Sequence, residues 1–173
     1  MPMSTLHLRP AGEADEAFLA DLYRATRADL LALPLEPALI DDLVAMQHKM
    51  QVAGYRHSHP DASYQVLELD GVAVGRVVTA PVAGAMRLVD IAVAPPSRGK
   101  GVAREVVRRL QARAARTGLD LTLAVRKDNP AACRLYAQLG FVAEGEDELG
   151  LALRWRARPG STGSVGATSG STA

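Results

Sequence analysis

Residues 86–116 read MRLVDIAVAPPSRGKGVAREVVRRLQARAAR, and this stretch decides the fold. It opens with an aliphatic, β-branched run that predicts a strand, breaks at Pro95-Pro96, and crosses the glycine-containing turn 97–101. A helix is predicted next because apolar residues then recur at helical spacing, namely Ala103, Val106, Val107, Leu110 and Ala114. The stretch therefore predicts a strand, a glycine turn and a helix in succession.

The turn has the chemistry of an anion site. The first N–H groups of a helix lack partners within the helix, and the helix dipole places partial positive charge at that end. Gly99 and Gly101 remove side chains that would hold a phosphate away from the backbone, while Arg98 and Lys100 add full positive charge. This combination favours a diphosphate ligand. The alternative is a solvated basic turn in which the glycines serve only the backbone conformation.

The spacing of the turn excludes two common phosphate loops. A P-loop requires G-x-x-x-x-G-K-[ST], but no glycine stands five residues before Gly99, and Gly101 occupies the Ser or Thr position. A Rossmann fingerprint starting at Gly99 would place its third glycine at Arg104. What fits is Arg98-x-x-Gly101-x-Ala103, which resembles the Q/R-x-x-G-x-G/A signature of the GCN5-related N-acetyltransferase (GNAT) superfamily. In that family the loop holds the pyrophosphate of acetyl-coenzyme A.

A second motif strengthens the resemblance. Residues 129–141, NPAACRLYAQLGF, are similar to the family's N-x-x-A-x-x-L-Y-x-x-x-G-F. The resemblance covers about residues 4–157 and implies an α/β (α+β) acyl-CoA N-acyltransferase fold, with a mixed central sheet of about six to seven strands and about four flanking helices. Residues 158–173 are predicted to be a flexible tail, because a Gly, Ser and Thr-rich segment lacks the apolar content to fold alone.

The remaining elements follow from local patterns. Strands are predicted at 5–9, 63–69, 72–80, 119–125 and 150–156, with another beginning at Phe141, and helices at 14–25, 37–53 and 130–139. Segments 26–35 and 55–62 are predicted as loops, the first with a helical turn as the alternative, and both are expected to line an acceptor site. In the helix at 37–53, one apolar face is predicted to pack in the core and comprises Leu39, Leu43, Met46 and Met50.

Composition limits the class of protein. A chain of 173 residues with 48% hydrophobic residues suits one domain with a substantial core. A net charge of +1 and no long basic run argue against nucleic acid or a membrane surface as partner. The single cysteine, Cys133, excludes an intrachain disulfide, and with no apolar span or signal-like start the expected compartment is the cytoplasm. The histidines form no ligand motif, so no metal is predicted.

The resemblance implies a site as well as a fold. It implies direct transfer of an acetyl group from acetyl-coenzyme A, as co-substrate, to a primary amine of a small molecule or protein. The positions that match the family's cofactor contacts are the main chain of Ile91, Ala92 and Val93, the turn residues Arg98, Gly99, Lys100, Gly101, Val102 and Ala103, and Asn129 and Tyr136. In the family this tyrosine is the general acid that protonates the leaving thiolate, although its place on an apolar helix face also suits a core tyrosine.

The general base departs from the family pattern. Arg87 occupies one common position of the family's glutamate, and Asp90 is the only carboxylate on the strand. Asp90 either accepts the amine's proton, directly or through water, or pairs with an arginine; removal of the proton by solvent is a third route. For the whole protein, the alternatives are a non-catalytic acyl-CoA-binding module and a transferase that uses another acyl donor. The oligomeric state is open, with homodimers common in the family.

Overall fold

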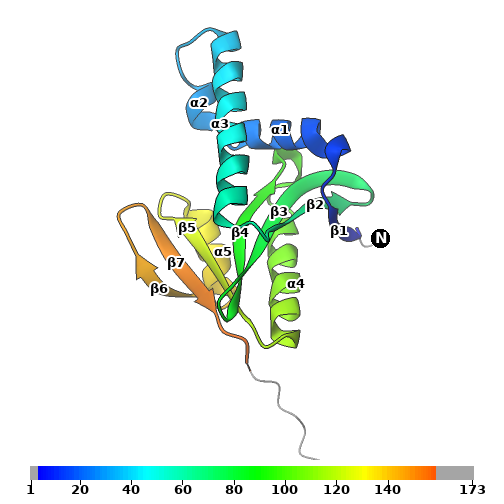
Figure 1. The fold of residues 1–173 in the computed structure, drawn as a ribbon, viewed down its shortest axis with the longest axis vertical. Coiled ribbons are helices and arrows are strands. Elements are labelled where there is room, and N and C mark those ends of the chain that lie inside the picture. Colours follow the sequence, from blue (N-terminus) through cyan, green and yellow to red (C-terminus); the bar gives the residue numbers. More distant parts are fainter. Residues whose placement is uncertain (1–3, 159–173) are drawn as a thin grey trace, which may run out of the picture.

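A seven-stranded mixed sheet forms the centre of the fold, with the strand order β1-β2-β3-β4-β5-β7-β6 (Figure 1). The computed structural model describes residues 4–158, so the tail predicted at 158–173 lies, except for its first residue, outside the described residues. The strands are β1 Leu6–Pro10, β2 Ser63–Leu69, β3 Val72–Val82, β4 Ala85–Val93, β5 Asp120–Arg126, β6 Val142–Glu146 and β7 Gly150–Trp155. The helices are α1 Glu16–Ala25, α2 Ala28–Leu31, α3 Pro37–Ser58, α4 Val102–Arg116 and α5 Pro130–Gln138.

Strands β1 to β4 form an antiparallel meander, and β4 and β5 form a parallel pair. Asp70 and Gly71, predicted as a hairpin turn, both have positive φ, 51° and 82°, as a tight β2–β3 turn requires. The parallel pair is joined through α4, and β7 then adds antiparallel to β5, with β6 outside it. The predicted mixed sheet and its strand, turn and helix unit are confirmed.

Helices cover both faces of the sheet. On one face, α4 and α5 share a core with the strands that includes Val77, Leu88, Val106, Val107, Leu123 and Tyr136. Because side chains alternate along a strand, Arg76 points to the other face, where it contacts α3 through Gln51. Helices α1, α2 and α3 lie on that second face around a smaller cluster of Tyr23, Leu30, Ile40 and Val44. None of the helices within residues 4–158 is both long and apolar enough to cross a membrane.

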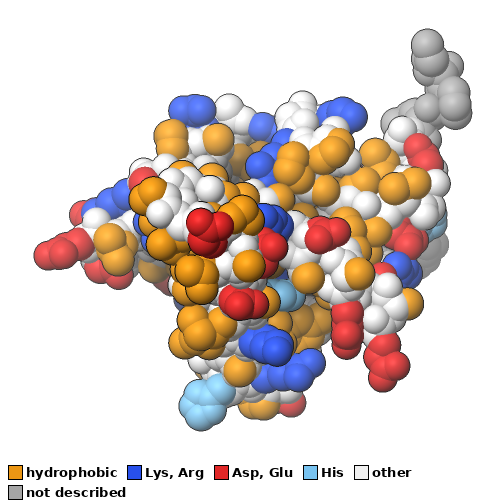
Figure 2. Space-filling model, turned by 90° about the horizontal axis from the view of Figure 1, so that it is seen from above, with side chains coloured by type: hydrophobic (Ala, Val, Ile, Leu, Met, Phe, Trp, Pro, Cys, Tyr) orange, Lys and Arg blue, Asp and Glu red, His pale blue; other side chains and the backbone are white. Residues whose placement is uncertain are grey.

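Two predictions about this second layer were wrong. Helix α3 continues to Ser58, through residues predicted as a polar loop. Its buried side chains are Ile40 and Val44, whereas most of the stripe predicted to face the core is exposed, namely Leu39, Met46 and Met50. Figure 2 shows hydrophobic side chains gathered where the molecule is seen from above, the end that α2 and the start of α3 occupy in Figure 1. Periodicity identified an apolar stripe correctly but did not reveal what covers it.

Gly75 is required where β3 pairs with the end of β4. A Cβ atom at this position would lie 2.4 Å from the carbonyl oxygen of Ala92 and 3.0 Å from Cδ1 of Leu67. Gly75→Ala is therefore expected to destabilise the protein by about 1–3 kcal/mol, measured by urea unfolding. Gly54→Ala, where a Cβ meets nothing within 4 Å on helix α3, is the control and is expected to stabilise by roughly 1 kcal/mol. Equal effects of the two substitutions would contradict this account.

Candidate active site

The two central strands separate after a short parallel ladder. Pairing joins residues 85–88 of β4 to residues 120–123 of β5 and goes no further. At the same point β4 has an extra residue, because Leu88 lies opposite Thr79 and Asp90 opposite Val78, which leaves Val89 as a bulge. Beyond the ladder a cleft of about 440 Å³ opens, and its walls include Val89, Asp90, Ile91, Val93, Arg98, Ala103, Val125, Arg126, Asn129, Leu135 and Tyr136.

One edge of β4 faces this cleft with unused backbone groups. Ala94 donates its N–H to the carbonyl of Val74 on β3, at 2.8 Å. Since N–H directions alternate along a strand, the N–H groups of Ile91 and Val93 point the other way, into the gap beyond the ladder, while that of Ala92 points to β3. Ala92 accordingly does not line the cleft. The cleft thus offers main-chain donors to an extended ligand lying along β4.

The glycine turn ends at the start of α4, as predicted. Gly99 and Gly101 have φ of 72° and 79°, and Gly101 is the N-cap residue of the helix. The backbone amides of residues 99–104 have no hydrogen-bond partner within residues 4–158. Residues 99–101 are exposed, whereas the side chain of Val102 is buried and fixes the helix start against the core. A row of unpaired amides with the helix dipole behind it is a site for an anion.

Arg98 holds the turn in place. Its Nε donates to the carbonyl of Val93 at 2.9 Å, and its Nη2 donates to the carbonyl of Ala25, at the end of α1, at 3.5 Å. Arg98 also lines the cleft. It therefore couples the turn to the end of β4 and adds a positive charge to the cleft wall. The side chain of neighbouring Lys100 is exposed.

Helix α5 supplies the opposite wall. Asn129 caps the helix, as predicted, because its Oδ1 accepts from the amide of Ala132 at 3.1 Å, and the residue still lines the cleft. Tyr136 is buried and packs edge-to-face on Phe141, with ring centroids 5.5 Å apart. Burial, and secondarily the Asp90 carboxylate, raises the pKa of Tyr136 to about 12. No hydrogen bond within the described residues uses its hydroxyl, and the residue lines the cleft, so the hydroxyl is free to meet a ligand.

Asp90 lines the cleft but also forms an ion pair with Arg76 of β3. Arg76 is buried, and its Nη2 also donates to Gln51 of α3 at 3.2 Å, while its Nε is buried without a partner. The bond to Arg76 uses Oδ2 of the carboxylate and leaves Oδ1 for a ligand or a water. The sequence allowed Asp90 to pair with an arginine, and the structure shows that this arginine is Arg76. The pairing fixes the orientation of the carboxylate.

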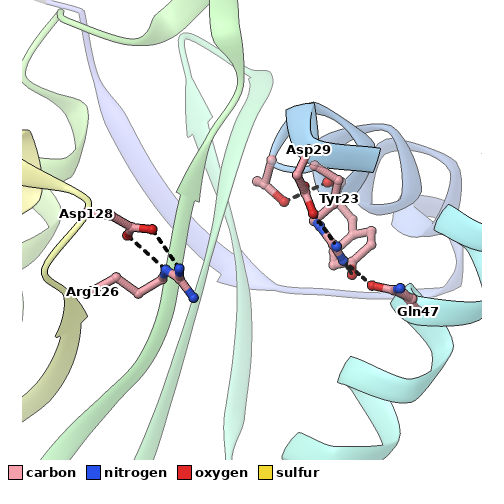
Figure 3. A network of polar contacts seen from close by, with 7 residues as sticks. Tyr23, Asp29, Gln47, Arg126 and Asp128 are labelled. Atoms are coloured by element: carbon pink, nitrogen blue, oxygen red, sulfur yellow. Dashed lines mark hydrogen bonds and ion pairs between the residues drawn. The ribbon is translucent and has the colours of Figure 1, made fainter. Parts of the chain in front are cut away.

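Two further polar clusters, one around Tyr23 and one at Arg126, are drawn in Figure 3. Arg27 donates to the hydroxyl of Tyr23 at 2.7 Å and to Gln47, and it pairs with Asp29 at 2.7 Å. At the end of β5, Arg126 pairs with Asp128 at 2.6 Å. Neither of the two loops predicted to line the acceptor site, 26–35 and 55–62, contributes to the cleft wall. Sequence patterns gave no signal for Arg76, because its pairing with Asp90 depends on strand register, or for Arg126, because its place in the cleft wall depends on the path of the chain.

Residues 20–141, more than half of the chain, match the family model for the acetyltransferase (GNAT) family. The chain belongs to the GNAT family. Among curated proteins none matches the chain as a relative. Within the described residues, no group of three or more His, Cys, Asp or Glu side chains could hold a metal ion.

Solved structures of GNAT enzymes share the fold at low identity. PaiA N-acetyltransferase from Thermoplasma acidophilum, in complex with coenzyme A, is 15% identical with a TM-score of 0.68, covering 88% of this chain and 99% of its own. The ribosomal-protein-S18-alanine N-acetyltransferase from Escherichia coli is 20% identical, with a TM-score of 0.63, 91% of this chain covered and 98% of its own. Spermidine N-acetyltransferase from Vibrio cholerae, in complex with coenzyme A and spermine, is 22% identical, with a TM-score of 0.62, 88% of this chain covered and 95% of its own.

Proposed function

We propose that this GNAT protein is an acetyl-coenzyme A-dependent N-acetyltransferase that acts on a primary amine of a small molecule or a protein. The observation that carries the proposal is the row of free amides at residues 99–104 beside a cleft that contains Asp90 and Tyr136. Family membership and the coenzyme A-bound neighbours support the choice of donor. The amides and the cleft together fit a ligand with a diphosphate and a long, narrow arm.

Different groups of residues would bind different parts of acetyl-coenzyme A. The amides of residues 99–104, with the charges of Arg98 and Lys100 beside them, would hold the diphosphate. Gly101 keeps this surface free of side chains. The N–H groups of Ile91 and Val93 would pair with the amide groups of the pantetheine arm, and Asn129 would contact that arm from the α5 side. Ala92 would hold β4 in place through its pairing with β3, Val102 would anchor the start of α4 in the core, and Ala103 would contact the ligand from the cleft wall.

The reaction requires three functions of the chain, namely stabilisation of the developing oxyanion, a general acid and a general base. Acetyl-coenzyme A supplies the thioester whose carbonyl carbon the amine attacks as the C–S bond breaks. An amide of β4 would stabilise the charge that develops on the carbonyl oxygen. Tyr136 would give its proton to the leaving thiolate, since its hydroxyl is free and remains protonated at neutral pH. Asp90 would accept the amine's proton directly or through a water on Oδ1.

A binding and product assay tests the proposal. Calorimetry should detect coenzyme A binding, and release of free thiol from acetyl-coenzyme A should depend on an added amine. The amine panel should include polyamines and peptides with free N-termini, because structural neighbours act on spermidine and on a ribosomal-protein alanine. Binding without thiol release across the panel would instead indicate an acyl-CoA-binding module. Competition between acyl-CoA donors would reveal a different donor preference.

Asp90→Asn tests the route of the proton. If Asp90 accepts it, kcat/KM for the amine should fall by at least about tenfold near neutral pH, because general-base catalysis contributes on the order of a hundredfold or more. The carboxamide keeps one oxygen for the bond to Arg76. Arg76→Met is the comparison, since it removes the ion pair and leaves the carboxylate. A loss of thermal stability in both variants with unchanged kcat/KM would show that Asp90 serves the ion pair alone.

A further inference from the structure

We infer that helix α3 is the dimerisation surface of this protein, and that it packs antiparallel against α3 of a second copy of the chain. The surface is the stripe formed by Leu39, Leu43, Met46, Met50 and Ala53. These positions follow each other at alternating steps of four and three residues, which is the spacing of a helix seam that meets another helix. The inference does not depend on the proposed catalytic activity.

The stripe is unpartnered in the single chain. Leu39, Met46 and Met50 are 56%, 51% and 65% exposed, although all three belong to one regular helix of 22 residues. The opposite side of α3 is already occupied, because Ile40 and Val44 pack on α1 and α2 and Gln51 reaches Arg76. Leu31, Leu33 and Leu35, all exposed, extend the apolar surface beside the start of the helix. A stripe of exposed apolar side chains that continues from one element to the next on a folded chain indicates an interface.

The flanking charges select a second copy as the occupant. Asp42 and Lys49 stand one heptad apart on the same flank of the stripe, and neither has an ion-pair partner among the described residues. A two-fold axis through the stripe near Ala45 and Met46 reverses one helix against the other. It then places Asp42 of each copy beside Lys49 of the other copy, which gives two equivalent pairs. The surface is thus complementary to itself in charge as well as in hydrophobicity.

The same charges distinguish the two possible orientations. In a parallel pair, each flanking residue would meet the opposite flank of the other helix, where Gln47 and Gly54 stand. Neither of these residues carries a charge, so Asp42 and Lys49 would gain nothing. In the antiparallel pair both charges are matched. The antiparallel two-fold dimer is therefore the arrangement that the sequence and the structure favour together.

Sedimentation equilibrium of the full chain, in reducing buffer so that Cys133 forms no disulfide, tests the surface. The wild-type protein should be dimeric, and the double variant Met46→Glu/Met50→Glu should weaken the dimer by more than about a hundredfold, since each copy loses two buried side chains. Leu149→Glu is the matched control, because Leu149 is 67% exposed in the β6–β7 turn, and it should leave the dimer unchanged. Circular dichroism of each variant checks folding. A monomeric wild type, or a dimer that tolerates the double substitution, would overturn the inference.

A charge exchange tests the orientation separately. Asp42→Lys and Lys49→Asp each place two pairs of like charges at the antiparallel interface, so each should weaken the dimer by about threefold to thirtyfold at low salt. The double variant Asp42→Lys/Lys49→Asp restores opposite charges and should recover most of the wild-type affinity. Recovery is expected only when both residues meet across the two-fold axis. Additive losses in the double variant would rule out the antiparallel arrangement.

Discussion

Gly101→Val is expected to weaken coenzyme A binding on the order of a thousandfold in a titration calorimeter. Gly101 has φ of 79°, a conformation that a β-branched residue adopts only with strain. If the backbone relaxes to relieve this strain, the turn moves and the amides are displaced. If the turn keeps its conformation, the isopropyl group of the valine covers the free amides at the start of α4. Loss of about two charge-assisted hydrogen bonds, each worth roughly 1.5–3 kcal/mol, gives the expected factor.

Gly84→Val separates this effect from strain in general. Gly84 also has positive φ, 68°, and a Cβ there meets nothing within 4 Å, as at Gly101. It lies in the turn between β3 and β4, outside the cleft wall. Both variants should lose similar stability, but Gly84→Val should bind coenzyme A like the wild type. If Gly101→Val bound within about tenfold of the wild type, the diphosphate would not rest on these amides.

The accuracy of the sequence predictions follows the range of the interactions involved. The turn at 97–101 was predicted correctly because its glycines, its charges and the helix that follows are neighbours in the chain. The N-cap role of Asn129 was correct for the same reason. The Asp70-Gly71 hairpin is also a local signal. Each of these features depends on the backbone conformation of a few neighbouring residues, and local residue patterns predict such conformations.

Features that depend on register could not be predicted. The partner of Asp90 is decided by the bulge at Val89, which sets the face on which the carboxylate lies and the β3 residue beside it. No periodicity in β4 signals a bulge. The exposure of Met46 and Met50 was missed for a related reason, since a hydrophobic pattern reports that a face is to be covered and not which molecule covers it. The exposure of these two methionines is the evidence for a second copy of the chain at α3.

Tyr136→Phe is expected to lower kcat by about a hundredfold to a thousandfold, the range for loss of a general acid. Phenylalanine preserves the edge-to-face contact with Phe141, so the helix should stay in place and the affinity for coenzyme A should change by less than about fivefold. The measurement is the steady-state rate of thiol release, together with calorimetry of coenzyme A binding. A loss of kcat without loss of binding assigns the hydroxyl to the chemical step.

The pH profile and a second tyrosine make this test specific. Tyr136 acts in its protonated form, and burial raises its pKa from 10.0 to about 12, so the acid form persists well above neutral pH. The ratio of wild-type to variant kcat should therefore stay constant from about pH 7 to about pH 10 and fall only above that range. Tyr55 is the matched control, because burial, and secondarily Asp90, also raises its pKa to about 12, yet it does not line the cleft. Tyr55→Phe should keep kcat within about threefold, and an equal loss in both variants would mean that the hydroxyl of Tyr136 is structural, since a perturbed pKa alone does not identify a catalytic acid.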